Sequence, residues 1–264
     1  MILRTSELAF GYGRAAVGSD VTLSVEHGEV LCLLGPNGCG KTTLFKTLLG
    51  LLPRQHGLVE LDGEDIAGLS RAQFACRVAY VPQATAAFFP FIVKDVVLMG
   101  RASRVATFAS PGATDRQATA RALDMLEIAH LSERPFTAIS GGERQMVLIA
   151  RALAQEPAMI VMDEPTASLD FGNQARVLEC IRSLSRSGLA VVLSTHDPGH
   201  AFACADKVAL MKKGKLVAIG SPIDVVTPDS LRNLYGVDVA VEYLDAAGHH
   251  VCAPALPQPR RPVS

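Results

Sequence analysis

The sequence lacks an excess of charge of either sign. Its 264 residues include 25 Lys and Arg against 26 Asp and Glu, for a formal net charge of −1. A chain that binds nucleic acid mainly through the phosphates usually carries a surplus of basic residues. The charge balance therefore gives no electrostatic reason to expect nucleic acid as a partner.

Long hydrophobic runs and paired cysteines are also missing. No apolar run approaches the ~20 residues of a membrane-spanning helix, and residues 1–10 do not have the pattern of a secretory signal. The six cysteines contain no CxxC pair and are too scattered for a metal site or a disulfide framework. Such cysteine usage fits a reducing compartment. If the protein serves a membrane process, we expect it to do so as a peripheral subunit on the cytoplasmic face.

Short apolar segments rich in Val, Ile and Leu alternate with helical patterns along most of the chain. Predicted strands span residues 21–25, 30–34, 58–61, 78–81, 159–162, 190–194, 208–211 and 215–219. Predicted helices include residues 41–49, 115–129, 142–155 and 172–187. Because the strands are almost continuously apolar, we expect an α/β fold with a largely parallel central sheet.

The stretch from about Gln83 to Gln155 is mostly helical, and we interpret it as a subdomain inserted into the α/β core. The expected organisation is a core of residues 1–84 and 156–236, an inserted subdomain of residues 85–155 and a C-terminal extension of residues 237–264. Four prolines among residues 253–264 predict disorder from about residue 253.

A glycine-rich motif follows the predicted strand at residues 30–34. Residues 35–43 read GPNGCGKTT, match the pattern GxxxxGK[ST] and lead into a helix at Lys41. Backbone N–H groups and the helix N-terminus can then surround a phosphate, with Lys41 on the β- and γ-phosphates and Thr42 on Mg²⁺. The flanking strand and helix disfavour the alternative, a turn that binds nothing. The expected nucleotide contacts are Gly35, Pro36, Asn37, Gly38, Cys39, Gly40, Lys41, Thr42 and Thr43.

Two adjacent carboxylates, Asp163 and Glu164, end another buried strand. Neighbouring strand residues point to opposite faces, so the two can have different roles. Asp163 can reach the Mg²⁺ shell, and Glu164 can polarise a water in line with the γ-phosphate. Strand ends often carry solvated acids, and it is the phosphate-binding motif upstream that favours the functional interpretation.

Residues 139–145 read ISGGERQ and precede an amphipathic helix. Ser140, Gly141 and Gly142 offer donors at a helix N-terminus, which suits a phosphate. The same residues fit an ordinary capping box between Ser140 and Glu143, and both interpretations can hold together. The segment resembles the signature motif of ATP-binding cassette (ABC) proteins, although Leu is commoner than Ile139, and Gln is often found in place of Glu143.

Further markers resemble those of the same family and occur in the family's order. They are Tyr12 for adenine stacking, Gln83 of the Q-loop, Asp170 of the D-loop and the switch residue His196. The resemblance covers roughly residues 3–250 and implies a P-loop NTPase of the ABC type with an inserted helical subdomain and an N-terminal antiparallel β portion. It assigns catalysis to Glu164, His196 and Gln83, and Mg²⁺ to Thr42, Gln83 and Asp163.

The family resemblance also implies cofactors and partners. ATP with Mg²⁺ is expected between the P-loop of one subunit and the signature helix of a second copy, paired head to tail. Two integral-membrane permease subunits are expected as partners, with an extracytoplasmic solute-binding protein as an indirect one.

Other segments resemble the ATPases of large (type II) importers of ferric siderophores, haem and vitamin B12. They are residues 95–104 (DVVLMGRASR), 231–238 (LRNLYGVD) and 248–251 (GHHV). Residues 107–111 and 136–140 resemble a branch that imports molybdate or tungstate. An importer of a metal chelate is thus the first hypothesis, and an oxyanion importer is its alternative.

We expect residues 88–104 to dock the coupling helices of the permease. The alternative is a plain helix with Arg101 and Arg104 solvated. We interpret His249 and His250 as a pair in a solvated loop, because no third metal ligand is evident at useful spacing.

Three rival functions remain. A soluble ABC ATPase that does not serve transport usually has two cassettes or a long coiled coil, whereas we expect one cassette with a compact insertion here. An exporter cassette is commonly fused to membrane helices, and no such apolar run is found in this sequence. A module that binds ATP without hydrolysing it would not need Glu164 and His196.

Overall fold

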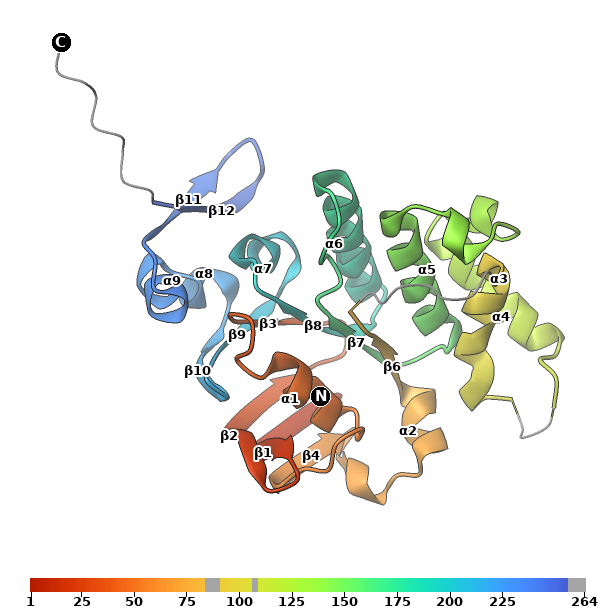
Figure 1. The fold of residues 1–264 in the computed structure, drawn as a ribbon, viewed down its shortest axis with the longest axis horizontal. Coiled ribbons are helices and arrows are strands. Elements are labelled where there is room, and N and C mark those ends of the chain that lie inside the picture. Colours follow the sequence, from red (N-terminus) through yellow and green to blue (C-terminus); the bar gives the residue numbers. More distant parts are fainter. Residues whose placement is uncertain (84–90, 106–108, 256–264) are drawn as a thin grey trace, which may run out of the picture.

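A six-stranded sheet forms the centre of the molecule (Figure 1), and its strand order is β10-β9-β3-β8-β7-β6. The computed structural model describes residues 1–83, 91–105 and 109–255. The strands are β3 (Val30–Leu34), β6 (Val78–Val81), β7 (Met159–Asp163), β8 (Ala190–Thr195), β9 (Lys207–Lys212) and β10 (Lys215–Gly220). Only β10 is antiparallel to its neighbour, which confirms the expected α/β fold with a largely parallel sheet.

Strand β3 shows why the central strands read as continuous apolar runs. All five of its residues are buried, and they contribute alternately to two cores. Leu31 and Leu33 pack into one core, whereas Cys32 and Leu34 pack into the other, on the opposite face of the sheet. Burial on both faces removes the polar alternation of a half-exposed strand.

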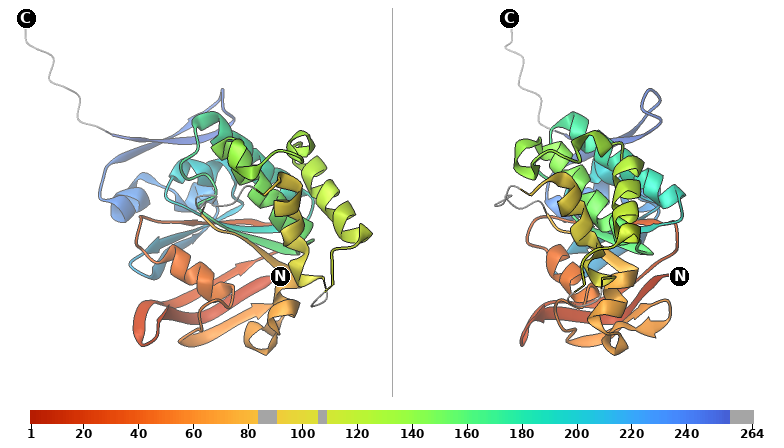
Figure 2. Two further views of the ribbon diagram at one scale, coloured as in Figure 1. Left: turned by 45° about the vertical axis from the view of Figure 1, so that its right-hand side comes forward. Right: turned by 90° about the vertical axis from the view of Figure 1, so that its right-hand side faces the viewer.

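A second, four-stranded sheet has the order β2-β1-β4-β5 and is antiparallel, which confirms the expected N-terminal β portion. Its strands are β1 (Leu3–Tyr12), β2 (Ala15–Val25), β4 (His56–Leu61) and β5 (Glu64–Asp65). Helix α1 (Lys41–Leu48) lies between the two sheets (Figure 2), and its Leu44, Phe45 and Leu48 fill the core there.

Helices cover the other face of the central sheet and continue into a helical region beside β6 (Figure 1). They are α3 (Val93–Leu98), α4 (Ala113–Met125), α5 (Gly141–Ala154), α6 (Phe171–Arg186) and α7 (Pro198–Cys204), with short α2 (Arg71–Arg77) before β6. The short 3₁₀ turns are η1 (Ile66–Gly68), η2 (Met99–Ser103), η3 (Ala129–Leu131) and η4 (Phe136–Ala138). Parts of the segments at residues 88–104 and 107–111 lie outside the described residues.

The C-terminal part continues through α8 (Pro222–Val225) and α9 (Pro228–Tyr235) into a hairpin of β11 (Val239–Leu244) and β12 (His249–Pro254). The assignment of His249 and His250 to a solvated loop is wrong, because both lie in β12. The ring of His250 stacks on Phe202 of α7 with a centroid distance of 5.3 Å. Cross-strand pairing and this stacking order the hairpin. Residues 256–264 of the predicted disordered tail lie outside the described residues.

Within the described ranges, no helix is both long enough and apolar enough to cross a bilayer.

Candidate active site

The expected site residues gather where parallel strands end. The glycine-rich loop follows β3, Asp163 ends β7 and is followed by Glu164, and His196 follows β8. Because β7, β8 and β3 are adjacent and parallel, their carboxyl ends meet at one edge of the sheet. Ligands of open α/β sheets bind at this edge.

The loop at residues 35–40 has the backbone that a phosphate cradle needs. Gly38 and Gly40 have φ values of 76° and 108°, which are unfavourable for residues with a side chain. Gly40 also stands at the N-cap of α1, so the first N–H groups of that helix face the loop. The donor set and the positive end of the helix dipole fit a polyphosphate.

Lys41 places its ammonium group inside this loop. The residue is buried, and its Nζ donates to the carbonyl oxygens of Gly35 at 2.7 Å and Pro36 at 3.2 Å. Nζ also lies 3.5 Å from Oε1 of Glu164. A positive charge is thus held at the cradle by the protein's own oxygens.

Glu164 lies between two cations or potential cations of the site. Its Oε2 is 3.4 Å from Nδ1 of His196, while its Oε1 faces Lys41. The backbone of Glu164 has a φ of 47°, which is strained for a residue with a side chain. Such strain persists only where neighbouring contacts impose it, and it directs this carboxylate toward the two partners.

Ser194 holds both acidic residues in place. Its Oγ donates to Oδ1 of Asp163 at 2.6 Å and accepts the N–H of Glu164 at 3.0 Å. Asp163 and Ser194 are fully or almost fully buried and face each other across the β7–β8 pairing. One hydroxyl therefore fixes the carboxylate of the first residue and the backbone of the second.

The loop that carries His196 is fastened from two sides. The hydroxyl of Tyr235 on α9 donates to the carbonyl oxygen of His196 at 2.8 Å. Beneath the loop, Nδ1 of the buried His200 lies 2.9 Å from Oγ1 of Thr195. Burial lowers the pKa of His200, against the opposing effect of Asp197. His196 itself stays about half exposed, with 51% of its side-chain area accessible.

The signature segment forms the expected capping box. The N–H of Glu143 donates to Oγ of Ser140 at 3.3 Å, and the N–H of Ser140 donates to Oε2 of Glu143 at 2.7 Å. Ser140 and Gly141 are exposed at the start of α5, whereas Gly142 is buried against Asn173 of α6. No hydrogen bond or ion pair between described residues joins this segment to the P-loop. The donors that remain exposed are free to meet a phosphate from outside the subunit.

The other expected residues lie at the rim of the site. Asp170 caps α6 by accepting the N–H of Asn173, and the ring of Tyr12 is half exposed at the end of β1. Thr42 and Gln83 are exposed. Gln83 makes no hydrogen bond within the described part of the chain.

Cys39 is the exception inside the P-loop because its side chain points inward. It is only 6% exposed, and burial raises the pKa of its thiol. A nucleotide would therefore meet the backbone of Cys39 and not its sulfur.

Comparisons with known proteins agree with this geometry. The family model described as "ABC transporter" matches residues 19–167, which is more than half of the chain. This chain belongs to the ABC transporter family.

Relatives of this ABC ATPase include proteins that are named as import subunits. An uncharacterised ABC transporter ATP-binding protein of Haemophilus influenzae is 41% identical over 89% of both chains. The hemin import ATP-binding protein HmuV of Rhodococcus jostii is 39% identical over 98% of this chain and 86% of its own. The cobalamin import ATP-binding protein BtuD of Halobacterium salinarum is 40% identical over 87% of this chain and 57% of its own.

Solved structures show the same fold. A transporter described as of the metal-chelate type, in an inward-facing conformation, aligns with a TM-score of 0.86 and 33% identity over 97% of both chains. An ATP-binding cassette in its ADP conformation aligns with a TM-score of 0.80 and 25% identity, over 89% of this chain and 98% of its own.

Two residues that position the ABC site were not predicted from the sequence. Ser194 could have been suspected, because a parallel pairing of the two predicted strands sets it opposite Asp163. No sequence signal indicated Tyr235, since its contact with His196 depends on how α9 packs.

Proposed function

We propose that this chain is the ATP-hydrolysing subunit of an importer for a metal chelate, such as haem, cobalamin or a ferric siderophore. The observation that carries the proposal is the position of Glu164 between Lys41 and His196 at the end of β7. An ABC ATPase with this arrangement holds its base, its phosphate-binding cation and its switch residue together. The names of the relatives supply the class of solute.

The residues present fit a magnesium nucleotide. Carboxylate and hydroxyl oxygens are the ligands that Mg²⁺ prefers in proteins. Asp163 and the exposed Thr42 would supply such oxygens, and Gln83 would add an amide oxygen, beside a loop whose N–H groups suit phosphate. When bound, Mg²⁺ would neutralise charge on the β- and γ-phosphates.

We assign roles to the protein's own residues from their contacts together with the family resemblance. Lys41 exchanges its bonds to loop carbonyls for bonds to the β- and γ-phosphates. Glu164 accepts the proton of the attacking water as the water oxygen bonds to the γ-phosphorus, and the bond from that phosphorus to the bridging oxygen breaks to release ADP. His196 stabilises the γ-phosphate and orients Glu164, while Tyr12 stacks on adenine.

A second copy completes the site. Ser140 and Gly141 offer exposed donors at a helix N-terminus that does not bond to the P-loop of its own chain. Two copies arranged head to tail place this N-terminus on the nucleotide of the partner, with Asp170 near the centre of the interface. Two helix N-termini balance the charge of a triphosphate better than one does.

A groove of about 520 Å³ between the helical region and the core suits a helix of the permease. Its walls include Met99 and Ser103 of η2, Phe74 of α2, and Tyr80 of β6. Arg151 also lines the groove, and burial lowers the pKa of its guanidinium. None of the described residues forms a hydrogen bond with this guanidinium group. The partner expected here is a short amphipathic helix that carries a carboxylate, and its docking would hold this subunit at the cytoplasmic face of the membrane.

The variant Glu164→Gln tests the assignment of the base. It keeps the shape of the side chain and removes the proton acceptor, so we expect kcat to fall about 10²–10³-fold. ATP binding persists in this variant, and ATP traps the head-to-tail dimer in size-exclusion chromatography. Near-normal turnover would contradict the role of Glu164.

The solute is tested in cells. A strain that lacks this subunit is grown with scarce metals, and its elemental content is compared with that of the complemented strain. A selective fall in iron or cobalt supports the proposal. A fall in molybdenum or tungsten with iron unchanged would replace it by an oxyanion importer, and no change in any of these would indicate an ABC ATPase that does not serve metal import.

A further inference from the structure

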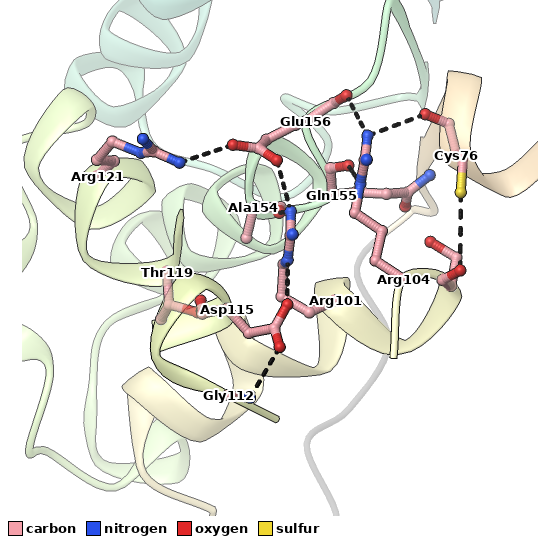
Figure 3. Close-up of polar contacts among 11 residues, drawn as sticks. Cys76, Arg101, Arg104, Gly112, Asp115, Thr119, Arg121, Ala154, Gln155 and Glu156 are labelled. Carbon is pink, nitrogen blue, oxygen red and sulfur yellow. Dashed lines mark hydrogen bonds and ion pairs between the residues drawn. The ribbon is translucent and has the colours of Figure 1, made fainter. Parts of the chain in front are cut away.

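Arg101 does not lie in solvent, as one interpretation of its segment had it. The residue lies on η2, where it contacts the end of α5 (Figure 3). It is buried, with 7% of its surface exposed. A buried guanidinium is stable only when its donors are paired. The partners of Arg101 therefore show what the segment around it is built to hold.

Arg101 reaches the C-terminal end of the signature helix α5. Its guanidinium donates to the carbonyl oxygen of Ala154 at 2.8 Å, although the two residues are 53 positions apart. It also bonds Oε2 of Glu156 at 2.8 Å and Oδ1 of Asp115 at 2.9 Å. Hydrogen bonds from Arg101 lower the pKa of both carboxyl groups, so both stay ionised around the guanidinium.

Arg104 continues the same contact one turn further. Its guanidinium donates to the carbonyl oxygens of Gln155 at 2.7 Å and Glu156 at 3.0 Å, and weakly to that of Cys76 at 3.4 Å. The last carbonyl groups of a helix lack partners within the helix, and positive charge is favourable at that end. Arg101 of η2 and Arg104, which directly follows η2, thus cap the end of α5 from outside.

Gly100 allows η2 to come close enough for these bonds. A Cβ atom at this position would lie 2.0 Å from the carbonyl oxygen of Arg151, which is backbone of α5 and cannot rotate away. Any residue with a side chain would push η2 off the helix. Gly100 therefore permits the close approach of η2 to α5, and Arg101 holds η2 there through its hydrogen bonds.

The contact also reaches the core through Gln155. The side-chain amide of Gln155 donates to the carbonyl oxygens of Ala75 and Val78, the latter at 2.8 Å. Ala75 belongs to α2 and Val78 begins β6, so the end of α5 is tied to the segment that leads into the Q-loop. Just after Gln155, the chain passes from the helical region into the core.

The contact between η2 and α5 lies between two surfaces, the groove described above and the N-terminus of α5. On one side, Met99 and Ser103 of η2 form a wall of the groove described above, next to Arg151 of α5. On the other side, α5 begins at the signature residues Ser140 and Gly141. The 14 residues of the helix make a rod of about 21 Å between the two ends.

We propose that Gly100, Arg101 and Arg104 form a rigid joint that holds the end of the signature helix α5 against η2, so that loss of the joint misplaces the signature residues relative to the nucleotide. The inference rests on the proposed function, because it assumes that the N-terminus of α5 acts on ATP in a dimer. Arg101 is a positioning residue here: it touches the end of α5 and not the nucleotide.

The test compares Arg101→Gln with Arg121→Gln in the full chain. Arg121 pairs with Oε1 of Glu156 but bonds no carbonyl oxygen of α5, and its side chain is 59% exposed. The matched control therefore removes one ion pair from the same carboxylate and leaves the joint intact. Nucleotide sites per chain and Kd are measured with a fluorescent ATP analogue, and kcat and KM are measured by phosphate release.

For Arg101→Gln we expect an unchanged number of sites and an unchanged Kd of the single chain, with kcat about 10–100-fold lower, since a misplacement of about 1 Å can cost about 100-fold. In a Glu164→Gln background, the same substitution weakens the ATP-driven dimer. Arg101→Lys recovers part of kcat, because it keeps the charge but not the planar fork. A loss of folded protein alone would lower the number of sites and leave kcat per site unchanged.

Equal kcat per site in Arg101→Gln and Arg121→Gln would contradict the proposed role of the joint. If Arg101→Gln does not fold, the exposed Arg104→Gln replaces it with the same expectations. If the unmodified chain neither binds nor hydrolyses ATP, the proposed function fails. The joint is then tested by amide hydrogen exchange, which should accelerate in α5 and η2 for Arg101→Gln and stay slow for Arg121→Gln.

Discussion

Replacing Ser194 by Ala tests whether one hydroxyl holds both acids of the site. The hydroxyl donates to the buried carboxylate of Asp163 and accepts the N–H of Glu164. A hydrogen bond to a charged group contributes about 1.5–3 kcal/mol, and an unpaired buried N–H costs about 1–3 kcal/mol. Because Glu164 is only partly buried, we expect Ser194→Ala to lower the free energy of unfolding by about 2–4 kcal/mol.

The same substitution should also lower Tm and kcat. In a domain of this size each kcal/mol shifts Tm by about 2–4 °C, so Tm should fall by about 4–16 °C. The strained φ of Glu164 relaxes once its N–H is free, and the carboxylate moves away from Lys41 and His196. We expect kcat per folded molecule to fall about 10–100-fold.

Ser185→Ala is the matched control. Ser185 is also buried, and its Oγ donates to the neutral carbonyl oxygen of Gly28 at 2.7 Å, away from the active site. This change should cost about 1 kcal/mol and leave kcat unaltered. Urea unfolding and phosphate release are measured on both variants. Equal losses of stability with unchanged kcat in Ser194→Ala would refute the role of this hydroxyl.

Two further predictions use the pKa directions. Iodoacetamide should alkylate the buried Cys39 more slowly than the half-buried Cys76, and faster as pH rises toward the raised pKa of Cys39, with peptide mass spectrometry as the readout. ATP should protect Cys39, and full nucleotide binding after its alkylation would contradict the steric argument. Burial lowers the pKa of His200 below its usual 6.5 despite Asp197, so the unfolded chain binds the proton more readily. Stability should therefore be complete above pH 6.5 and decline as pH falls below it. Urea unfolding of His200→Gln should show a flatter profile, and an unchanged slope would assign the decline to other groups.

Local sequence was sufficient where one segment carries its own signal. The apolar runs at residues 30–34 and 78–81 predicted β3 and β6 with the bounds that the structure has, because burial on both faces leaves only apolar residues. Strand β1 was not predicted, since its sequence LRTSELAFGY mixes polar and apolar residues around the positive φ of Glu7. The hairpin β11–β12 was missed as well, because none of its strand residues is buried and they gain their order from pairing and from α7.

The site shows the same division. The P-loop was predictable because a continuous motif makes the cradle, whereas Ser194 and Tyr235 act through strands and helices that meet only in the folded chain. Arg101 is the clearest failure of local reasoning. An arginine near the end of a short helix is ordinarily solvated, and nothing nearby in the sequence indicates that the end of α5 will arrive to accept its bonds.

The place of β3 in the sheet has a consequence for how the chain folds during synthesis. The P-loop strand leaves the ribosome early, yet both of its neighbours, β8 and β9, come from residues beyond 189. Strand β6 likewise waits for β7, which follows the whole helical insertion. Pairings between distant segments form slowly because the intervening chain must first be ordered. The nascent chain therefore has no working phosphate cradle until most of it has been translated, and Val30–Leu34 stays an uncovered apolar segment for which chaperones are the natural binders.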